Sequence, residues 1–187
     1  MTIPELNRST DPADNKGMPI AAHQVAHEVP SPRSSEVHDA VTLLPTRAVL
    51  LERLAERTPT SDDRAAALVL VGLLHRDTGW PMPGSHLDQV AAALSADLRS
   101  DDWLARSGPT EFALLLNGTA QDAETAANRL VQTVVGAGVL GLTACAGIAG
   151  LTPDTSPSEV HRQATLCLTT ARSVGGGRVI RYSGSRR

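Results

Sequence analysis

The chain has 187 residues, 41% of them hydrophobic and 20% charged, which corresponds to one globular domain plus extra chain rather than two domains. The formal net charge is −3 and aromatic residues make up 2%, so we expect neither a generic nucleic-acid binder nor a base-stacking platform. No apolar stretch approaches the ~18–20 residues of a membrane-spanning helix, and the N-terminus does not resemble a secretory signal. We therefore expect a cytoplasmic protein that binds neither nucleic acid nor membranes.

Residues 1–38 contain many Pro, Ser, Asp, Asn and Thr residues and have no sustained hydrophobic periodicity. This composition predicts a disordered or loosely ordered arm, because it offers little apolar surface to offset the entropy of ordering. His23 and His27 have a spacing that suits a metal on a helix, but no third ligand is in view, so a solvated arm is the better interpretation. Cys145 and Cys167 lie in apolar segments and are expected to be buried thiols.

Hydrophobic periodicity predicts a regular succession of helices and strands from residue 39 onward. The run at 65–74 is continuously apolar, which is typical of a strand buried on both faces. The run at 140–149 alternates larger and smaller residues, which indicates a strand with a closely packed face. The predicted helices cover 46–57, 87–98, 121–135 and 158–172, and the predicted strands cover 65–74, 103–106, 111–116, 140–149 and 178–182, the last at a sheet edge.

This order predicts an α+β (two-layer α/β) domain at residues 39–183, followed by a short tail at 184–187. Its centre is a ferredoxin-like βαββαβ core, in which helices flank a mixed, mostly antiparallel sheet. A turn at 107–110 joins the second and third strands of this core.

Five segments resemble, in the same order, motifs of the GGDEF domain family, the diguanylate cyclases. The stretch R-S-G-P-T-E-F at 106–112 resembles the signature turn R-x-G-G-D-E-F. Four further stretches resemble the opening motif D-x-L-T-G-L-P-N-R, the helix and strand before the signature, V-T-x-S-x-G-x-A, and A-K-x-x-G-x-N-R-V; they lie at 39–47, 90–102, 142–149 and 171–179. The resemblance covers about 39–182 and implies the GGDEF, nucleotidyl-cyclase-like fold.

The family joins two GTP molecules with metal ions held on carboxylates, and this chain lacks most of those carboxylates. The family's D-x-D-type motif at the end of the first strand aligns with Gly72 and Leu74, so both are lost metal positions. The degenerate signature turn consists of Gly108, Pro109, Thr110, Glu111 and Phe112. Thr110 replaces the central metal-binding acid, and Pro109 removes a backbone N–H. Since Glu111 alone does not hold two magnesium ions, we expect no catalytic residue, metal or cofactor.

Compared with the family, this chain is also expected to have lost part of its substrate-binding residues. The base-reading loop after the first strand is about four residues short, with Trp80 and Pro81 where a polar reader would lie. Asp77 or Asp88 is a candidate displaced acid, although an ordinary solvated acid is the simpler interpretation.

Arg172 and Arg178 match the family's phosphate-holding basic residues, so they are candidates for residual phosphate contact. The alternative for both is a solvated pair near a helix C-terminus. The glycine run at 175–177 is interpreted first as a helix stop. The family's inhibitory product site is an R-x-x-D ending just before the signature. We align it with W-L-A-R at 103–106, and therefore expect it to be missing.

We expect a catalytically inactive GGDEF-like domain, not an enzyme, that acts as a regulatory or protein-interaction module in bacterial signalling with another protein as partner. The alternative is a sensor that retains weak guanine-nucleotide binding, of GTP or cyclic di-GMP, through Glu111, Arg172 and Arg178. An active diguanylate cyclase is the least supported interpretation, because the required acids are missing.

Overall fold

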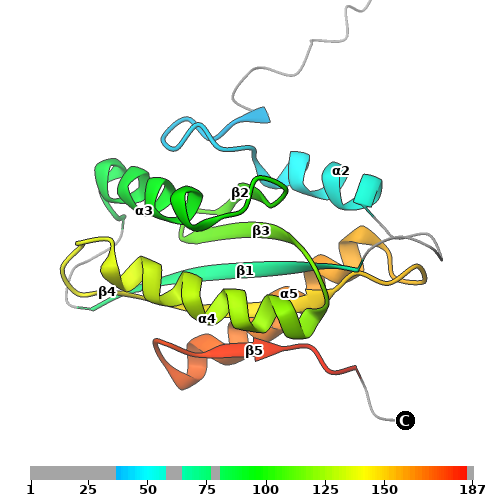
Figure 1. Cartoon of the computed structure of the whole chain (residues 1–187). Coiled ribbons are helices and arrows are strands. Elements are labelled where there is room, and N and C mark those ends of the chain that lie inside the picture. Colours follow the sequence, from blue (N-terminus) through cyan, green and yellow to red (C-terminus); the bar gives the residue numbers. More distant parts are fainter. Residues whose placement is uncertain (1–36, 58–64, 77–80, 185–187) are drawn as a thin grey trace, which may run out of the picture. The chain divides into compact units, whose positions relative to one another are not determined.

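A computed structural model describes residues 37–57, 65–76 and 81–184 (Figure 1). Each predicted helix and strand is present, with small differences at the ends. The elements are α2 (Arg47–Arg57), β1 (Ala66–His75), α3 (Gly84–Asp97), β2 (Trp103–Gly108), β3 (Glu111–Asn117), α4 (Ala120–Gly136), β4 (Leu142–Gly150), α5 (Pro157–Val174) and β5 (Val179–Arg181).

The five strands form one sheet in the order β2-β3-β1-β4-β5. β1 pairs antiparallel with both β3 and β4, and β2 pairs antiparallel with β3. Only β5 is parallel to its neighbour, β4, and it lies at the sheet edge as predicted. The mixed, mostly antiparallel sheet and its ferredoxin-like core, β1-α3-β2-β3-α4-β4, are therefore confirmed.

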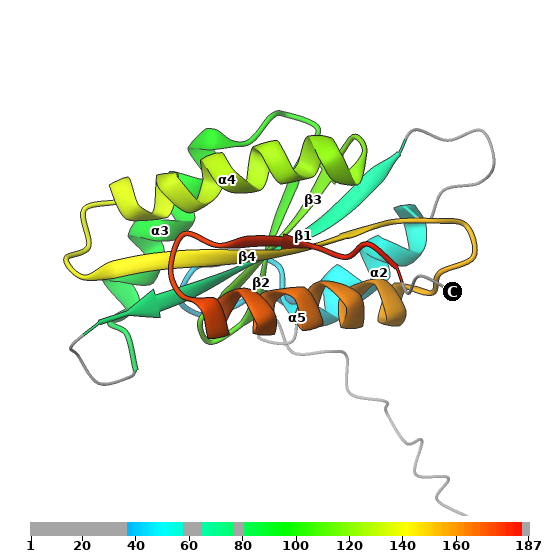
Figure 2. The same cartoon turned by 90° about the horizontal axis from the view of Figure 1, so that it is seen from below.

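Helices cover both faces of the sheet, as Figure 2 shows, with α3 and α4 on one face and α2 and α5 on the other. β1 is buried on both sides because its side chains alternate between two apolar clusters. Val69 and Val71 belong to the cluster under α3 and α4, whereas Leu68 and Leu70 belong to the cluster against α2 and α5. The ferredoxin-like core thus supplies two layers, and α2 and α5 add a third.

Local capping fixes the helices that carry the site. Thr119 and Asp122 form a reciprocal capping box at the start of α4, with the Thr119 hydroxyl accepting from the Asp122 backbone and the Asp122 carboxylate accepting from Thr119. The Ser156 side chain caps α5, and the helix ends at Gly175, whose φ of 122° favours glycine. The glycine run therefore acts as a helix stop, as predicted, and leaves Arg172 in the last turn of α5.

Three details differ from the predictions. Leu98 lies one residue beyond the end of α3, and Leu140 lies outside β4 with 94% of its surface exposed. The hairpin turn is shorter than expected, because β2 continues to Gly108.

The cysteines are buried free thiols, as predicted. His23, His27, Asp77 and Trp80 lie outside the described residues.

Candidate functional site

The degenerate signature turn lies beside the end of β1, where the lost metal positions were predicted. Gly72 of β1 pairs with Glu111 of β3 across the sheet. The backbone N–H of Leu73 donates to the carbonyl of Thr110 at 2.8 Å. The structure therefore brings three of the predicted positions, Gly72, Thr110 and Glu111, together.

Arg172 extends from α5 into this group. Its Nη1 lies 2.8 Å from Glu111 Oε1, and its Nη2 lies 3.4 Å from Thr110 Oγ1. A Cβ added to Gly72 would lie only 2.7 Å from Arg172 Nη2 and 2.9 Å from Leu168 Cδ1. The guanidinium thus fills the space into which a carboxylate at position 72 would project.

Glu111 and Arg172 form an internal ion pair at the hairpin. In a two-metal site, several fixed carboxylates surround the cations and leave positions open for substrate phosphates. Here the remaining acid, Glu111, is paired with a cation that is part of the chain, and both side chains are largely covered, with 30% exposure for Arg172 and 22% for Glu111. The nearby Cys145 thiol donates to the Gly72 carbonyl at 3.7 Å, and its burial raises the pKa of Cys145.

The other predicted residues do not join this group. Leu74 packs against the cluster under α2 and α5. Arg178 is exposed and lies just before β5. Within residues 37–57, 65–76 and 81–184, its one hydrogen bond is at the backbone carbonyl, which accepts from the N–H of Ala146. Asp88 is exposed on α3.

A cavity of about 380 Å³ lies beside the glycine run. It is lined by Leu73, Leu74, His75, Arg76, Thr143, Gly175 and Gly176. Arg172 and Arg178 are not among its lining residues, so the two predicted phosphate contacts do not share this cavity.

Buried Arg106 fixes the shape of the signature turn. Only 7% of its surface is exposed, and its Nε donates to the carbonyl of Gly108 at 2.6 Å. Its Nη2 donates to the carbonyl of Pro109, and the guanidinium lies over the Phe112 ring, 5.3 Å from the centroid. Since Pro109 has no N–H to contribute, these bonds to carbonyls provide an alternative anchor for the turn.

His161 connects α5 to the same hairpin. The side chain is 6% exposed, with Nε2 3.3 Å from Ser107 Oγ and Nδ1 3.4 Å from Thr165 Oγ1. Burial, followed by the charge of Arg47, lowers the pKa of His161, and Glu111 opposes this shift. The neutral imidazole is therefore the form that the fold favours.

We expect the free energy of unfolding to decrease as the pH falls below about 6.5, the ordinary pKa of histidine. His161 has the lower pKa in the folded state, so the unfolded chain binds the proton first and gains stability from it. The measurement is urea unfolding of the wild type and His161→Gln at pH 7.5 and 5.5. The wild type should lose more stability over this interval than the variant; an equal loss in both proteins would contradict the assignment.

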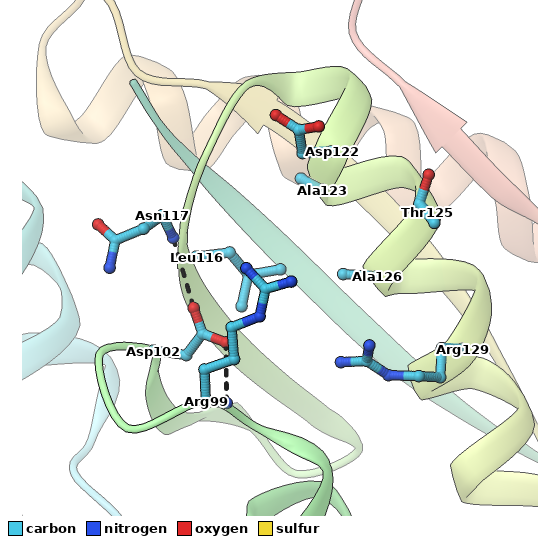
Figure 3. Close-up of a pocket in the computed structure, with 9 residues that line it drawn as sticks. All are labelled: Arg99, Asp102, Leu116, Asn117, Asp122, Ala123, Thr125, Ala126 and Arg129. Atoms are coloured by element: carbon cyan, nitrogen blue, oxygen red, sulfur yellow. Dashed lines mark hydrogen bonds between the residues drawn. The ribbon is translucent and has the colours of Figure 1, made fainter. Parts of the chain in front are cut away.

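A second polar site lies between β3 and α4 (Figure 3). The turn before β2 carries Arg99 and Asp102, and α4 carries Arg129; all three line a cavity of about 190 Å³. Both guanidinium groups point into the space between the strand and the helix. Asp102 is held in place because its carboxylate accepts from the backbone N–H of Arg99 at 3.1 Å and of Asn117 at 3.4 Å.

This site corrects the alignment of the family's product site. The stretch 103–106 belongs to β2, whereas residues 99–102 read R-S-D-D and end immediately before β2. The motif is therefore present, four positions upstream of the stretch with which it was aligned. The sequence signal for this site is the R-x-x-D spacing of Arg99 and Asp102.

Among residues 37–57, 65–76 and 81–184, no three His, Cys, Asp or Glu side chains come together as ligands for a metal ion. Within the same residues, no helix has the length and apolar character needed to cross a membrane.

The fold and the hairpin define the class of protein. The family model "Diguanylate cyclase, GGDEF domain" matches residues 36–178. The chain therefore belongs to the GGDEF domain family, whose proteins function in bacterial cyclic di-GMP signalling.

A curated relative is the bifunctional diguanylate cyclase/cyclic di-GMP phosphodiesterase MucR of Pseudomonas aeruginosa, 33% identical over 106 residues. This match covers 52% of the chain but only 16% of MucR. Among solved structures, the diguanylate cyclase SiaD of P. aeruginosa, in complex with its activator SiaC, has a TM-score of 0.66 at 27% identity, covering 79% of this chain and 62% of SiaD. The GGDEF domain of DgcB from Caulobacter crescentus, in complex with c-di-GMP, has a TM-score of 0.65 at 20% identity, covering 79% and 96%.

Proposed function

We propose that this chain is a catalytically inactive GGDEF domain that serves as a regulatory module in cyclic di-GMP signalling. The single observation that carries this proposal is the Arg172–Glu111 ion pair beside Gly72. The guanidinium stands where a cation would be needed, but it cannot coordinate phosphate oxygens and water as a metal ion does.

Charge supports the same conclusion. A triphosphate brings several negative charges, and in-line attack on it depends on cations held by fixed carboxylates. Gly72, Leu74 and Thr110 supply no carboxylate, and Glu111 is already neutralised by Arg172. GTP that reaches the hairpin would therefore find neither the metal ions nor an acid free to bind them.

The proposal is tested by incubating the purified chain with GTP and magnesium or manganese and quantifying cyclic di-GMP. We expect no product above a control without protein. Product that disappears in Glu111→Ala would show that the hairpin is catalytic and would overturn the proposal.

A second function is favoured by the cavity at Arg99, Asp102 and Arg129: binding of cyclic di-GMP. Guanidinium groups bind phosphate oxygens, and a carboxylate accepts hydrogen bonds from the N–H groups of a guanine edge. The cavity, about 190 Å³, is smaller than the ~300–1,000 Å³ of pockets that enclose small ligands, so it fits one phosphate or base edge rather than a whole dinucleotide.

Calorimetric titration with cyclic di-GMP tests this second function. We expect Arg99→Ala to weaken binding at least about tenfold, because a charged hydrogen bond to phosphate contributes about 1.5–3 kcal/mol. Arg162→Ala is the matched control, because it removes the same charge from a surface ion pair with Glu159 on α5. Equal affinities of the two variants would exclude the cavity as the binding site.

We propose that this domain acts by binding another protein. SiaD, a structural neighbour, is found with a protein activator, which supports a protein-binding role for this fold. A pull-down with the tagged wild-type chain, with and without cyclic di-GMP, tests whether ligand binding changes partner capture.

A further inference from the structure

Asp97 restrains one of the two arginines of the cavity between β3 and α4. Its carboxylate lies 2.9 Å from Arg129 Nε, and its backbone carbonyl accepts from Arg129 Nη2 at 3.0 Å. The Thr133 hydroxyl donates to the same carboxylate at 2.9 Å. Three contacts therefore tie the last residue of α3 to two residues of α4.

The position of Asp97 explains why it needs this partner. The C-terminus of a helix carries partial negative charge, which disfavours a carboxylate there. Asp97 is the last residue of α3 and its side chain is 24% exposed, so Arg129 compensates a charge that its own helix does not stabilise. Asp97 itself is not among the residues that line the cavity.

Arg99 is in a different situation. It lines the cavity and its guanidinium points into the space between β3 and α4 (Figure 3). Asp102 accepts from the backbone of Arg99, not from its guanidinium. Of the two arginines that line the cavity, Arg129 is therefore held by Asp97, whereas the Arg99 guanidinium points into the space between β3 and α4.

We propose that Asp97 competes with phosphate-bearing ligands for Arg129 and so lowers the affinity of this cavity for cyclic di-GMP. The proposal rests on the second function given above. A phosphate that binds Arg129 must share or replace the Asp97 carboxylate, and the negative charge of Asp97 repels it at close range. Binding therefore weakens the contact between the end of α3 and α4, and Asp97 is a positioning residue that acts through Arg129.

The test is calorimetric titration of cyclic di-GMP into the wild type, Asp97→Asn, Asp97→Glu and Glu124→Gln. Asp97→Asn keeps the shape of the side chain but removes its charge. We expect it to bind about fivefold more tightly than the wild type, the upper range for one partly exposed ion pair. Asp97→Glu keeps the charge and is expected to bind as the wild type does.

Glu124→Gln is the matched control. It removes one negative charge from α4 and breaks a similar pair, in which Arg181 Nε lies 3.0 Å from Glu124 Oε2. Glu124 does not line the cavity, so we expect unchanged affinity. This control separates competition at Arg129 from a general effect of net charge.

A second readout is hydrogen exchange at the end of α3, which should increase when cyclic di-GMP is added to the wild type but change little in Asp97→Asn. A purely structural role for Asp97 would give weaker binding in Asp97→Asn. Affinity equal to or below that of the wild type overturns the inference while the second function stands. If Asp97→Asn binds cyclic di-GMP and the wild type does not, the inference is supported. If neither the wild type nor Asp97→Asn binds, both the inference and the second function are overturned.

Discussion

Replacing Gly147 with alanine is expected to lower the free energy of unfolding by at least about 3 kcal/mol, the upper range for overpacking a core. Gly147 lies in β4 directly beneath α5, and a Cβ there would overlap the backbone of Leu168 and Ala164. Backbone atoms cannot rotate away as a flexible side chain does, so α5 would have to move off the sheet. This displacement would disrupt the apolar cluster that contains Leu168 and Val160.

The measurement is chemical denaturation of Gly147→Ala beside Gly136→Ala. Gly136 is the last residue of α4 and nothing lies within 4 Å of the space that its Cβ would fill. Alanine there should therefore be neutral or slightly stabilising. A Gly147→Ala protein within about 1 kcal/mol of the wild type would show that α5 does not pack on β4 as closely as described.

Restoring the family's acids is expected not to restore turnover. In the variant with Gly72→Asp, Leu74→Asp, Pro109→Gly and Thr110→Asp, carboxylates return to the strand end and the turn. The new side chain at 72 meets Arg172 and Leu168, so it would pair with the guanidinium or force it out. The alignment also predicts that the loop after β1 is too short to carry a base reader, and a misplacement of ~1 Å can reduce a rate about a hundredfold.

Cyclic di-GMP formation by this variant, with GTP and magnesium, is the measurement. The same four changes made together with Arg172→Lys, the residue type in the family's motif, provide the comparison. We also expect the fourfold variant to be less stable than the wild type without metal, because it crowds acids beside an apolar strand. Robust product from the fourfold variant would show that the pocket is intact and that only the acids had been lost.

The sheet and its core were predictable because burial leaves a periodic signal. β1 shows as a continuous apolar run, and the small residues of β4 predict the close packing that occurs at Gly147. The degenerate hairpin was found through the resemblance, and its neighbour Gly72 follows from strand alignment. These inferences depend on positions close in sequence or on a fixed strand register.

The partner of Glu111 was not predictable in the same way. Arg172 was recognised as a basic residue near a helix end, but its contact with Glu111 joins residues 61 positions apart and depends on how α5 lies on the sheet. Leu43 is another example: its φ of 55° places a leucine in the left-handed region, where the family's motif has glycine. Neither feature leaves a periodic pattern in the sequence.

The product-site motif at 99–102 was missed for a different reason. The motif lies in the turn before β2, and hydrophobic periodicity does not define the alignment of residues in a turn. An alignment that begins at the strand residues 103–106 therefore misses it. Arg129, which lines the same cavity, lies on α4 and is brought near Arg99 only by the fold.

The most direct test of the internal ion pair is thermal unfolding of the wild type with increasing magnesium, up to several millimolar. Ligands that bind the folded state raise the melting temperature by mass action. If Arg172 occupies the cation position at Glu111, the melting temperature should not change with magnesium. An increase of several degrees that is reversed by a chelator and absent in Glu111→Gln would show that the hairpin binds metal and would contradict this account.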